Sequence, residues 1–163
     1  PRAIFHSRND RLIAGRIQIG LSHDQLAYLA DPAVNLKSIK LSRRDLARGI
    51  FSKVDAGTTV AGTMMLASHC GIQTFVTGGI GGVHRGAERS MDISADLYEL
   101  GRTPMGVVCA GAKSILDLGL TLEVLVSRGW DRIVRSELIF LIAGNPWRER
   151  YHHRRDQRLP GLL

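Results

Sequence analysis

Alternating and periodic apolar positions predict short strands and helices in the first third of the chain. Residues 16–20 and residues 38–42 alternate apolar and polar side chains, and each run predicts a strand. Between them, Ser22 followed by Gln25 is typical of a helix start with a capping box. Asp31-Pro32 should end that helix, and a second short helix is expected to run to about Gly49. Residues 1–14 show no pattern that predicts an element.

The next stretch predicts a helix followed by a buried strand. Thr58 or Thr59 can cap a helix that continues to Cys70, and Gly71 lies just beyond its end. Residues 72–77 are rich in strand-forming side chains and lead directly into a glycine-rich loop, residues 78–86.

The same order then repeats once more. Ser94 predicts the cap of a helix through Leu100, Pro104 interrupts the chain, and residues 105–110 form a nearly continuous apolar run. A third helix is expected to start near Lys113, directly after that strand. Helices that alternate with buried apolar strands predict an α/β fold with a mixed, partly parallel sheet flanked by helices.

Length and composition are those of one globular domain. The chain has 163 residues, of which 44% are hydrophobic and 23% are charged. The longest apolar run near its end, Leu138–Ala143, is far shorter than the roughly 18 residues of a membrane span. No membrane segment and no secretory signal are expected. Because the chain begins with Pro1 and not with Met, we expect a fragment or a processed form.

The positive charge does not favour a nucleic-acid partner. The net charge is +7, but residues 46–128 carry seven basic and seven acidic side chains, so the whole excess lies toward the two ends. Aromatic residues make up only 6% of the chain, whereas nucleic-acid surfaces combine basic and aromatic side chains. Specific nucleic-acid binding is therefore not expected. Cys70 and Cys109 cannot form a disulfide framework and are expected to be buried, reduced thiols.

Two loops that follow predicted strands are candidates for chemistry, because sites in α/β sheets lie at the carboxyl ends of strands. The glycines of residues 78–86 can adopt positive φ and let a phosphate approach backbone N–H groups, or they can simply form a tight crossing to the next element. Lys113 leaves an apolar strand where a helix is expected. Desolvation and the helix N-terminus would favour its neutral, nucleophilic amine; the alternative is an ordinary exposed lysine.

A short acidic segment lies between these loops. Asp92 and Asp96 can face one pocket, where one carboxylate would hold a divalent cation and the other would move protons; ordinary helix capping is the alternative. His84 lies inside the glycine-rich loop and is a candidate substrate-binding residue. His69 has no second ligand at metal-binding spacing and is interpreted as a structural histidine.

Five long motifs occur in a fixed order between about Gly15 and Gly129. They are Lys40-Leu41-Ser42-Arg43-Arg44-Asp45-Leu46, Gly57-Thr58-Thr59-Val60-Ala61, Thr77-Gly78-Gly79-Ile80-Gly81-Gly82-Val83-His84-Arg85-Gly86, Asp92-Ile93-Ser94-Ala95-Asp96-Leu97 and the segment from Val107 through Lys113 to Asp117. Together these motifs resemble a known family, the pseudouridine-5′-phosphate glycosidases, which include the indigoidine synthase A-like proteins.

The resemblance implies an Mn²⁺-dependent homotrimeric enzyme that reversibly cleaves the C–C glycosidic bond of pseudouridine 5′-phosphate to uracil and ribose 5-phosphate. It implies that Lys113 is the nucleophile that forms a Schiff base and that Asp92 holds Mn²⁺. The implied substrate-binding residues are Lys40, Val60, Ser94, Ala95 and Asp96. A lysine suits this bond, because a C–C glycosidic bond offers no heteroatom leaving group for the usual pair of carboxylates to protonate.

The chain departs from the family pattern at both ends. The family's general acid is a glutamate upstream of the motifs, and residues 1–14 contain no Glu. We therefore expect an unassigned segment over residues 1–14, a partial glycosidase-like domain over 15–129 and a divergent, basic, poorly ordered tail over 130–163. The alternative to an active enzyme is an inactive fragment that keeps phosphosugar binding. The family relationship implies a cytoplasmic location, or a mitochondrial one in a eukaryote.

Overall fold

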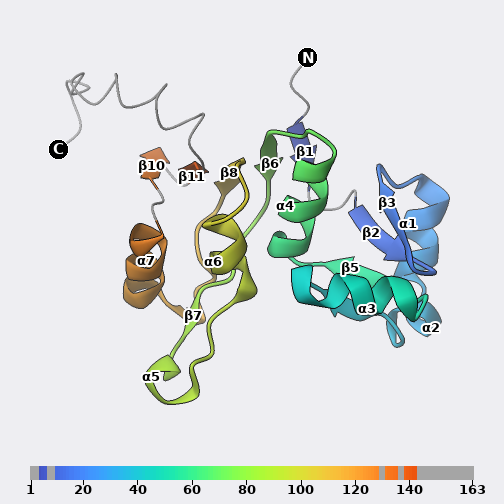
Figure 1. Ribbon diagram of the computed structural model, residues 1–163, viewed down its shortest axis with the longest axis horizontal. Helices are drawn as coiled ribbons and strands as arrows, with labels where there is room; N and C mark the ends of the chain where they lie inside the picture. The colour runs from blue at the N-terminus through green and yellow to red at the C-terminus, as the bar shows by residue number, and fades with distance from the viewer. Residues whose placement is uncertain (1–3, 7–9, 129–130, 136–137, 143–163) are drawn as a thin grey trace.

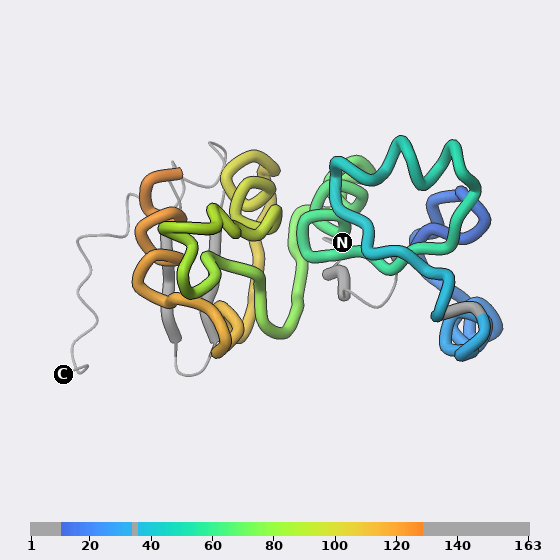
Figure 2. Tube along the Cα trace, turned by 90° about the horizontal axis from the view of Figure 1, so that it is seen from below, coloured from blue at the N-terminus to red at the C-terminus, as the bar shows by residue number. Residues whose placement is uncertain are grey.

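The computed structural model describes residues 4–6, 10–128, 131–135 and 138–142. Its elements form two lobes on either side of the helix α4, as Figures 1 and 2 show. The first lobe is built around a small sheet and the second around a larger one. The two sheets have separate hydrophobic cores.

The first lobe contains a four-stranded sheet in the order β3-β2-β5-β4. Strand β4 is parallel to β5, and the other pairs are antiparallel. Its core is small, with Leu12, Leu41 and Ala56 fully buried. The elements are β2 (Asp10–Ile13), β3 (Arg16–Ile19), α1 (His23–Ala30), α2 (Pro32–Asn35), β4 (Ile39–Leu41), the 3₁₀ helix η1 (Arg43–Asp45), α3 (Leu46–Phe51) and β5 (Ala56–Thr58).

The second lobe contains a five-stranded sheet in the order β1-β6-β8-β11-β10. Strands β1, β6 and β8 are parallel, whereas β11 is antiparallel to both β8 and β10. A separate antiparallel pair joins β7 to β9. The elements are β1 (Ile4–His6), α4 (Val60–His69), β6 (Thr74–Val76), β7 (Val83–His84), α5 (Ala87–Ser90), α6 (Ala95–Leu100), β8 (Gly106–Cys109), β9 (Leu116–Asp117), α7 (Leu118–Ser127), β10 (Asp131–Arg135) and β11 (Leu138–Ile142).

The larger core lies between this sheet and three helices. Phe75 of β6 and Val107 of β8 are buried against side chains of α4, α6 and α7, among them Met64, Leu97 and Leu125. Burial of this apolar surface is the main force that holds the helices on the sheet. The expected mixed, partly parallel sheet flanked by helices is therefore confirmed.

Local signals in the sequence placed most helix starts correctly. Ser22 and Gln25 form the expected capping box of α1, and Thr59 caps α4 by accepting a hydrogen bond from the N–H of Gly62. Ser94 caps α6. Gly71, just beyond α4, has a φ of +75°, which a glycine adopts at little cost. Of the two residues that could cap α4, the structure thus selects Thr59.

Three expectations were wrong. No helix begins near Lys113, because α7 starts at Leu118 with Asp117 as its cap. The tail from residue 130 was expected to be poorly ordered, but β10 and β11 lie within it; residues 1–14, for which the sequence predicted no element, contain β1 and β2. Residues 143–163 of that tail lie outside the described residues. Cys109 is buried as expected, and burial raises the pKa of its thiol, but Cys70 is exposed.

Among the residues that the structure describes, none of the helices combines the length and apolarity needed to cross a bilayer.

Candidate active site

Two adjoining cavities at the carboxyl ends of β4, β6 and β8 contain every residue that the sequence singled out. The first has a volume of about 460 Å³ and the second about 690 Å³. Val60 and Lys113 line the first cavity, and Asp92 and Ala95 line the second. The residues that line both are Lys40, Thr59, His84, Ser94 and Asp96. Segments far apart in the sequence therefore meet at one site.

Lys113 reaches the cavity because its loop is hydrogen-bonded to the glycine-rich loop. The parallel pairing of β6 and β8 continues beyond both strands: the Ile80 N–H donates to the Gly111 carbonyl at 2.8 Å, and the Lys113 N–H donates to the Ile80 carbonyl at 3.1 Å. Lys113 itself is exposed and lies four residues before the cap of α7. The expected helix N-terminus and the expected burial are both absent from this part of the described structure.

Asp96 organises the cavity instead of facing it as a free acid. Its side chain is buried, and each of its oxygens accepts one backbone N–H: Oδ1 from Ala61 at 2.9 Å and Oδ2 from Gly81 at 2.8 Å. The carboxylate thereby joins the first turn of α4 to the glycine-rich loop. Negatively charged acceptors make stronger hydrogen bonds than neutral ones, so this residue fixes two walls of the cavity at once.

The glycine-rich loop contains positions where any side chain would clash with neighbouring atoms. A Cβ atom on Gly81 would lie 2.1 Å from Ser94 Oγ, and one on Gly79 would lie 2.9 Å from the Lys113 Cγ. Positive φ, which the sequence suggested for the loop, occurs only at Gly86 among residues 78–86. Small residues here let α6 and the Lys113 loop approach the backbone closely.

Several N–H groups of this loop already have partners within the protein. The N–H groups of Ile80 and Gly81 donate to the Gly111 carbonyl and to Asp96. The Val83 N–H donates to Thr121 Oγ1 at 2.9 Å, and the His84 N–H donates to the Asp92 carbonyl at 3.0 Å. These groups cannot cradle a phosphate in the way that the sequence suggested. Side chains are the better candidates for holding an anion.

The charged side chains of the first cavity are mostly positive. Arg11, Lys40 and Lys113 line it together with His84, and Asp96 is the carboxylate that they face. That carboxylate is committed to two backbone N–H groups. A cavity with this balance attracts an anionic ligand, and a sugar phosphate is of a suitable size and charge.

Asp92 and His84 form a more open pair at the edge of the second cavity. Asp92 Oδ2 lies 3.9 Å from His84 Nδ1, and both side chains are substantially exposed. The residue before Asp92, Met91, has a φ of +55°, which is unusual for a residue with a side chain and holds the chain in a tight turn. The turn directs the following segment back along the cavity.

The donor set at Asp92 fits a hydrated divalent cation and not a closed protein cage. In the part of the chain that the structure describes, no group of three or more His, Cys, Asp or Glu side chains could hold a metal ion. A single carboxylate resembles the way in which small hard cations are often held, with water in the remaining positions. The expected metal role of Asp92 stays a prediction.

Sequence reasoning missed several residues that line the first cavity. Arg11 is the most important of these, because it adds a third positive charge from β2; its guanidinium donates to Thr58 Oγ1 at 3.4 Å. No local pattern could reveal it, since its position depends on the pairing of β2 with β5. The others are Thr77, Ile115 and Leu116.

Relatives of known name match most of the chain. A pseudouridine-5′-phosphate glycosidase from Cupriavidus pinatubonensis is 59% identical over 118 residues, which make up 72% of this chain and 37% of that protein. A pseudouridine-metabolizing bifunctional protein from Schizosaccharomyces pombe is 58% identical over 118 residues, which make up 72% of this chain and 16% of that protein. The chain thus spans less than two fifths of the length of these relatives.

Solved structures share the fold as well. The prealnumycin C-glycosynthase AlnA, solved in complex with ribulose 5-phosphate, has a TM-score of 0.69 and 41% identity over 74% of this chain and 39% of its own. An indigoidine synthase A-like protein from Thermotoga maritima has a TM-score of 0.66 and 33% identity over 73% of this chain and 38% of its own. The sequence profile described as "Indigoidine synthase A like protein" matches residues 11–131. The chain therefore belongs to the indigoidine synthase A-like family.

Proposed function

We propose that this chain is part of a pseudouridine-5′-phosphate glycosidase, which reversibly converts pseudouridine 5′-phosphate to uracil and ribose 5-phosphate. The observation that carries the proposal is the meeting of Lys113, Lys40 and the segment 92–96 around adjoining cavities. The names of the relatives from Cupriavidus pinatubonensis and Schizosaccharomyces pombe support the same substrate class.

In this proposal Lys113 is the nucleophile. Its amine displaces the ring oxygen from C1′, which opens the ribose and leaves that oxygen as the C4′ hydroxyl. The nitrogen lone pair then forms the imine as the bond from C1′ to the base breaks, and the electron pair of that bond, with a proton, stays on the ring carbon of uracil. Hydrolysis of the imine releases ribose 5-phosphate and restores the amine. Arg11 and Lys40 bind the phosphate through their positive charges, and Val60, Ser94 and Ala95 shape the cavity around the sugar.

The proposal assigns Mn²⁺ to Asp92, with His84 beside it. When bound, the cation supplies positive charge that stabilises negative charge developing on an oxygen of the substrate. Asp96 does not take part in this coordination, because its two oxygens hold the backbone of α4 and of the glycine-rich loop. The homotrimer and the cytoplasmic location expected from the resemblance belong to the same proposal.

Borohydride trapping tests the Schiff base directly. With ribose 5-phosphate and borohydride, we expect a stable ribityl-phosphate adduct on the peptide that contains Lys113, located by mass spectrometry. Lys113→Arg should abolish the adduct, because a guanidinium stays charged and does not attack a carbonyl. Lys53→Arg is the matched control, since Lys53 is also exposed and does not line the first cavity. Labelling spread over many lysines, or unchanged in Lys113→Arg, would refute the proposed role.

Binding of a phosphosugar without turnover is the second candidate function. The ribulose 5-phosphate bound by AlnA favours a phosphosugar ligand in either case. The two functions are separated by measuring pseudouridine 5′-phosphate formation from uracil and ribose 5-phosphate with Mn²⁺ present. Product at a rate that depends on Lys113 supports the enzyme; saturable binding of ribose 5-phosphate without product supports the second function.

A further inference from the structure

The segment that follows β4 makes a sharp turn toward α6. The Ser42 N–H and Ser42 Oγ both donate to Asp45 Oδ2, at 2.9 and 2.6 Å. The hydrogen bond from the Ser42 hydroxyl holds the pKa of Asp45 below its usual range, so the carboxylate stays charged and keeps the turn closed. The turn directs Arg43 toward α6 and leaves the side chain of Arg44 exposed.

Arg43 forms a two-point ion pair with Glu99 of α6. Its Nε lies 2.7 Å from Glu99 Oε2, and one terminal nitrogen lies 2.5 Å from Oε1. The Glu99 side chain is only 4% exposed, and Thr103 Oγ1 donates to it as well. Burial alone would raise the pKa of Glu99, but Arg43 and Thr103 outweigh it and hold that pKa below its usual range.

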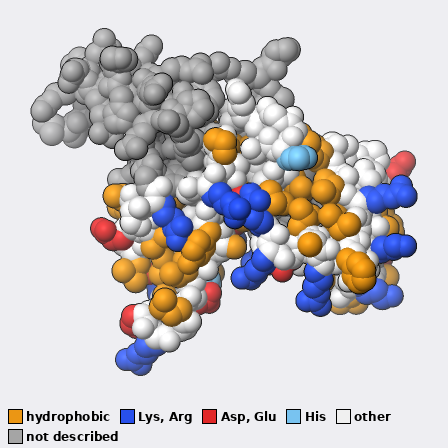
Figure 3. Space-filling view, in the orientation of Figure 1, with side chains coloured by type: hydrophobic (Ala, Val, Ile, Leu, Met, Phe, Trp, Pro, Cys, Tyr) orange, Lys and Arg blue, Asp and Glu red, His pale blue; other side chains and the backbone are white. Residues whose placement is uncertain are grey.

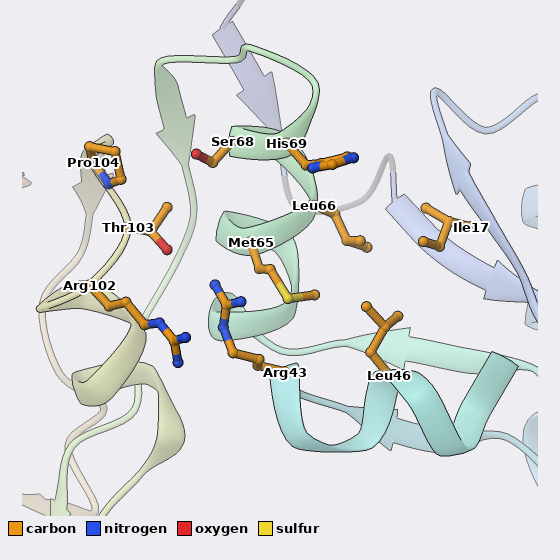
Figure 4. A pocket seen from close by; sticks show the side chains of 10 residues that line it. All are labelled: Ile17, Arg43, Leu46, Met65, Leu66, Ser68, His69, Arg102, Thr103 and Pro104. Carbon is orange, nitrogen blue, oxygen red and sulfur yellow. The ribbon is translucent and has the colours of Figure 1, made fainter. Parts of the chain in front are cut away.

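This ion pair lies at the boundary between the two lobes. Beside it runs a groove of about 660 Å³, with Arg43 and Leu46 on one wall and Arg102 and Thr103 on another. Figure 4 shows Arg43 and Arg102 extending toward one another across this groove, and Figure 3 shows basic side chains gathered in the same region. Beside this groove, the ion pair is a direct side-chain connection between η1 and α6.

Each partner of the ion pair lies three residues from a residue of the cavity. Arg43 follows Lys40, which β4 carries into both cavities, and Glu99 follows Asp96 on the same face of α6. Lys40 belongs to the first lobe and Asp96 to the second. The hydrogen bond from the Ala61 N–H to Asp96 is one connection between these two walls of the cavity, and the contact of η1 with α6 is a second.

We propose that Arg43 and Glu99 are positioning residues, whose ion pair holds Lys40 at a fixed distance from the segment 92–96 across the ligand cavity. They act through the backbone and do not touch the ligand. The inference rests on the proposed function for the identity of the ligand, but the geometric effect concerns the free protein. A lysine at position 43 keeps the charge and loses the paired hydrogen bonds, so it should not replace the arginine.

Hydrogen exchange of the free chain tests the positioning directly. We expect Arg43→Lys and Glu99→Gln to raise exchange in residues 39–45 and 92–97 by about tenfold, while exchange in β6 and β8 stays unchanged. The charge-swapped double variant, Arg43→Glu with Glu99→Arg, should restore part of the protection. Arg48→Lys on α3 is the matched control and should change neither segment. Unchanged exchange in both segments, or an equal rise in β6 and β8, would overturn the proposal.

Adduct formation at Lys113 then separates this inference from the proposed function. In the wild-type chain, half-maximal trapping defines a ribose 5-phosphate concentration, and both variants should raise it by about fivefold or more, because a displaced Lys40 binds the phosphate less well. If the variants leave it unchanged, the ion pair does not position Lys40. If the wild-type chain forms no adduct, the proposed function fails, and the exchange pattern alone decides on the ion pair.

Discussion

Asp92 is exposed and Asp96 is buried, so substitutions at these two carboxylates should have different effects on stability and on metal binding. Asp96→Asn replaces one acceptor by an NH₂ group that faces a backbone N–H, so we expect a loss of about 1–3 kcal/mol in the free energy of unfolding. Asp92→Asn should leave that free energy unchanged, because its side chain is exposed, and should weaken Mn²⁺ binding by about tenfold or more. Urea denaturation and calorimetric titration measure the two effects. Equal Mn²⁺ affinity in Asp92→Asn and in the wild type would remove the metal from this residue.

The glycines of the 78–86 loop should differ sharply in their tolerance of alanine. Gly81→Ala places a methyl group against Ser94 and Asp96, and we expect it to lower the free energy of unfolding by about 1–3 kcal/mol. Gly78→Ala is the matched control, because a Cβ there meets nothing within 4 Å. Thermal unfolding of the two variants gives the comparison. A similar melting temperature for both would show that the contacts around Gly81 relax without cost.

Sequence reasoning indicated which side chains lie around the cavities, but it did not indicate which groups Asp96 contacts. Asp92 and Asp96 were expected to face one pocket, and the structure places Asp92 at the second cavity and Asp96 at both, with Lys113 at the first. The role of Asp96 could not be predicted, because its partners, the N–H groups of Ala61 and Gly81, are far away in the sequence. Arg11 was missed for the same reason.

At the scale of elements, Thr121 joins α7 to β7 and should be sensitive to the loss of its hydroxyl. This buried side chain accepts the Val83 N–H at 2.9 Å and donates to the Asp117 carbonyl at 2.6 Å. Thr121→Val keeps the shape and leaves the Val83 N–H without its acceptor, so we expect a loss of about 1–3 kcal/mol in the free energy of unfolding. Thr121→Ser keeps the hydroxyl and should lose less. Equal stability of the two variants would contradict the prediction.

Elements with local signals were predicted, and elements that depend on distant pairing were not. Ser22, Thr59 and Ser94 mark helix starts because capping is a contact between near neighbours. The start of α7 was placed too early, because residues 110–113 continue the pairing with the glycine-rich loop, and nothing in their own sequence reveals that partner. Strands β1 and β11 likewise pair with strands far away in the sequence, β6 and β8.

For the molecule as a whole, the ion pair between the lobes predicts lower stability in acid. The pKa of Glu99 is held below that of an unfolded glutamate, about 4.3, so its contribution to stability is fully present above that pH and is lost as the pH falls through the lower folded value. The free energy of unfolding, measured by urea from pH 7 to pH 3, should therefore fall less steeply in Glu99→Gln than in the wild type. Glu88→Gln on the exposed helix α5 is the control. Parallel curves for Glu99→Gln and the wild type would contradict the prediction.

The dependence of the site on α6 has a consequence for synthesis on the ribosome. Arg43 precedes Glu99 by 56 residues, and Ala61 precedes Asp96 by 35. At a translation rate of about 5–20 residues per second, Glu99 is synthesised roughly 3–11 seconds after Arg43. During that interval the first lobe lacks its ion pair with α6 and is stabilised by its own small core. A nascent chain stalled before α6 should therefore be cut by protease near residues 42–48, and one stalled well beyond α6 should be protected there.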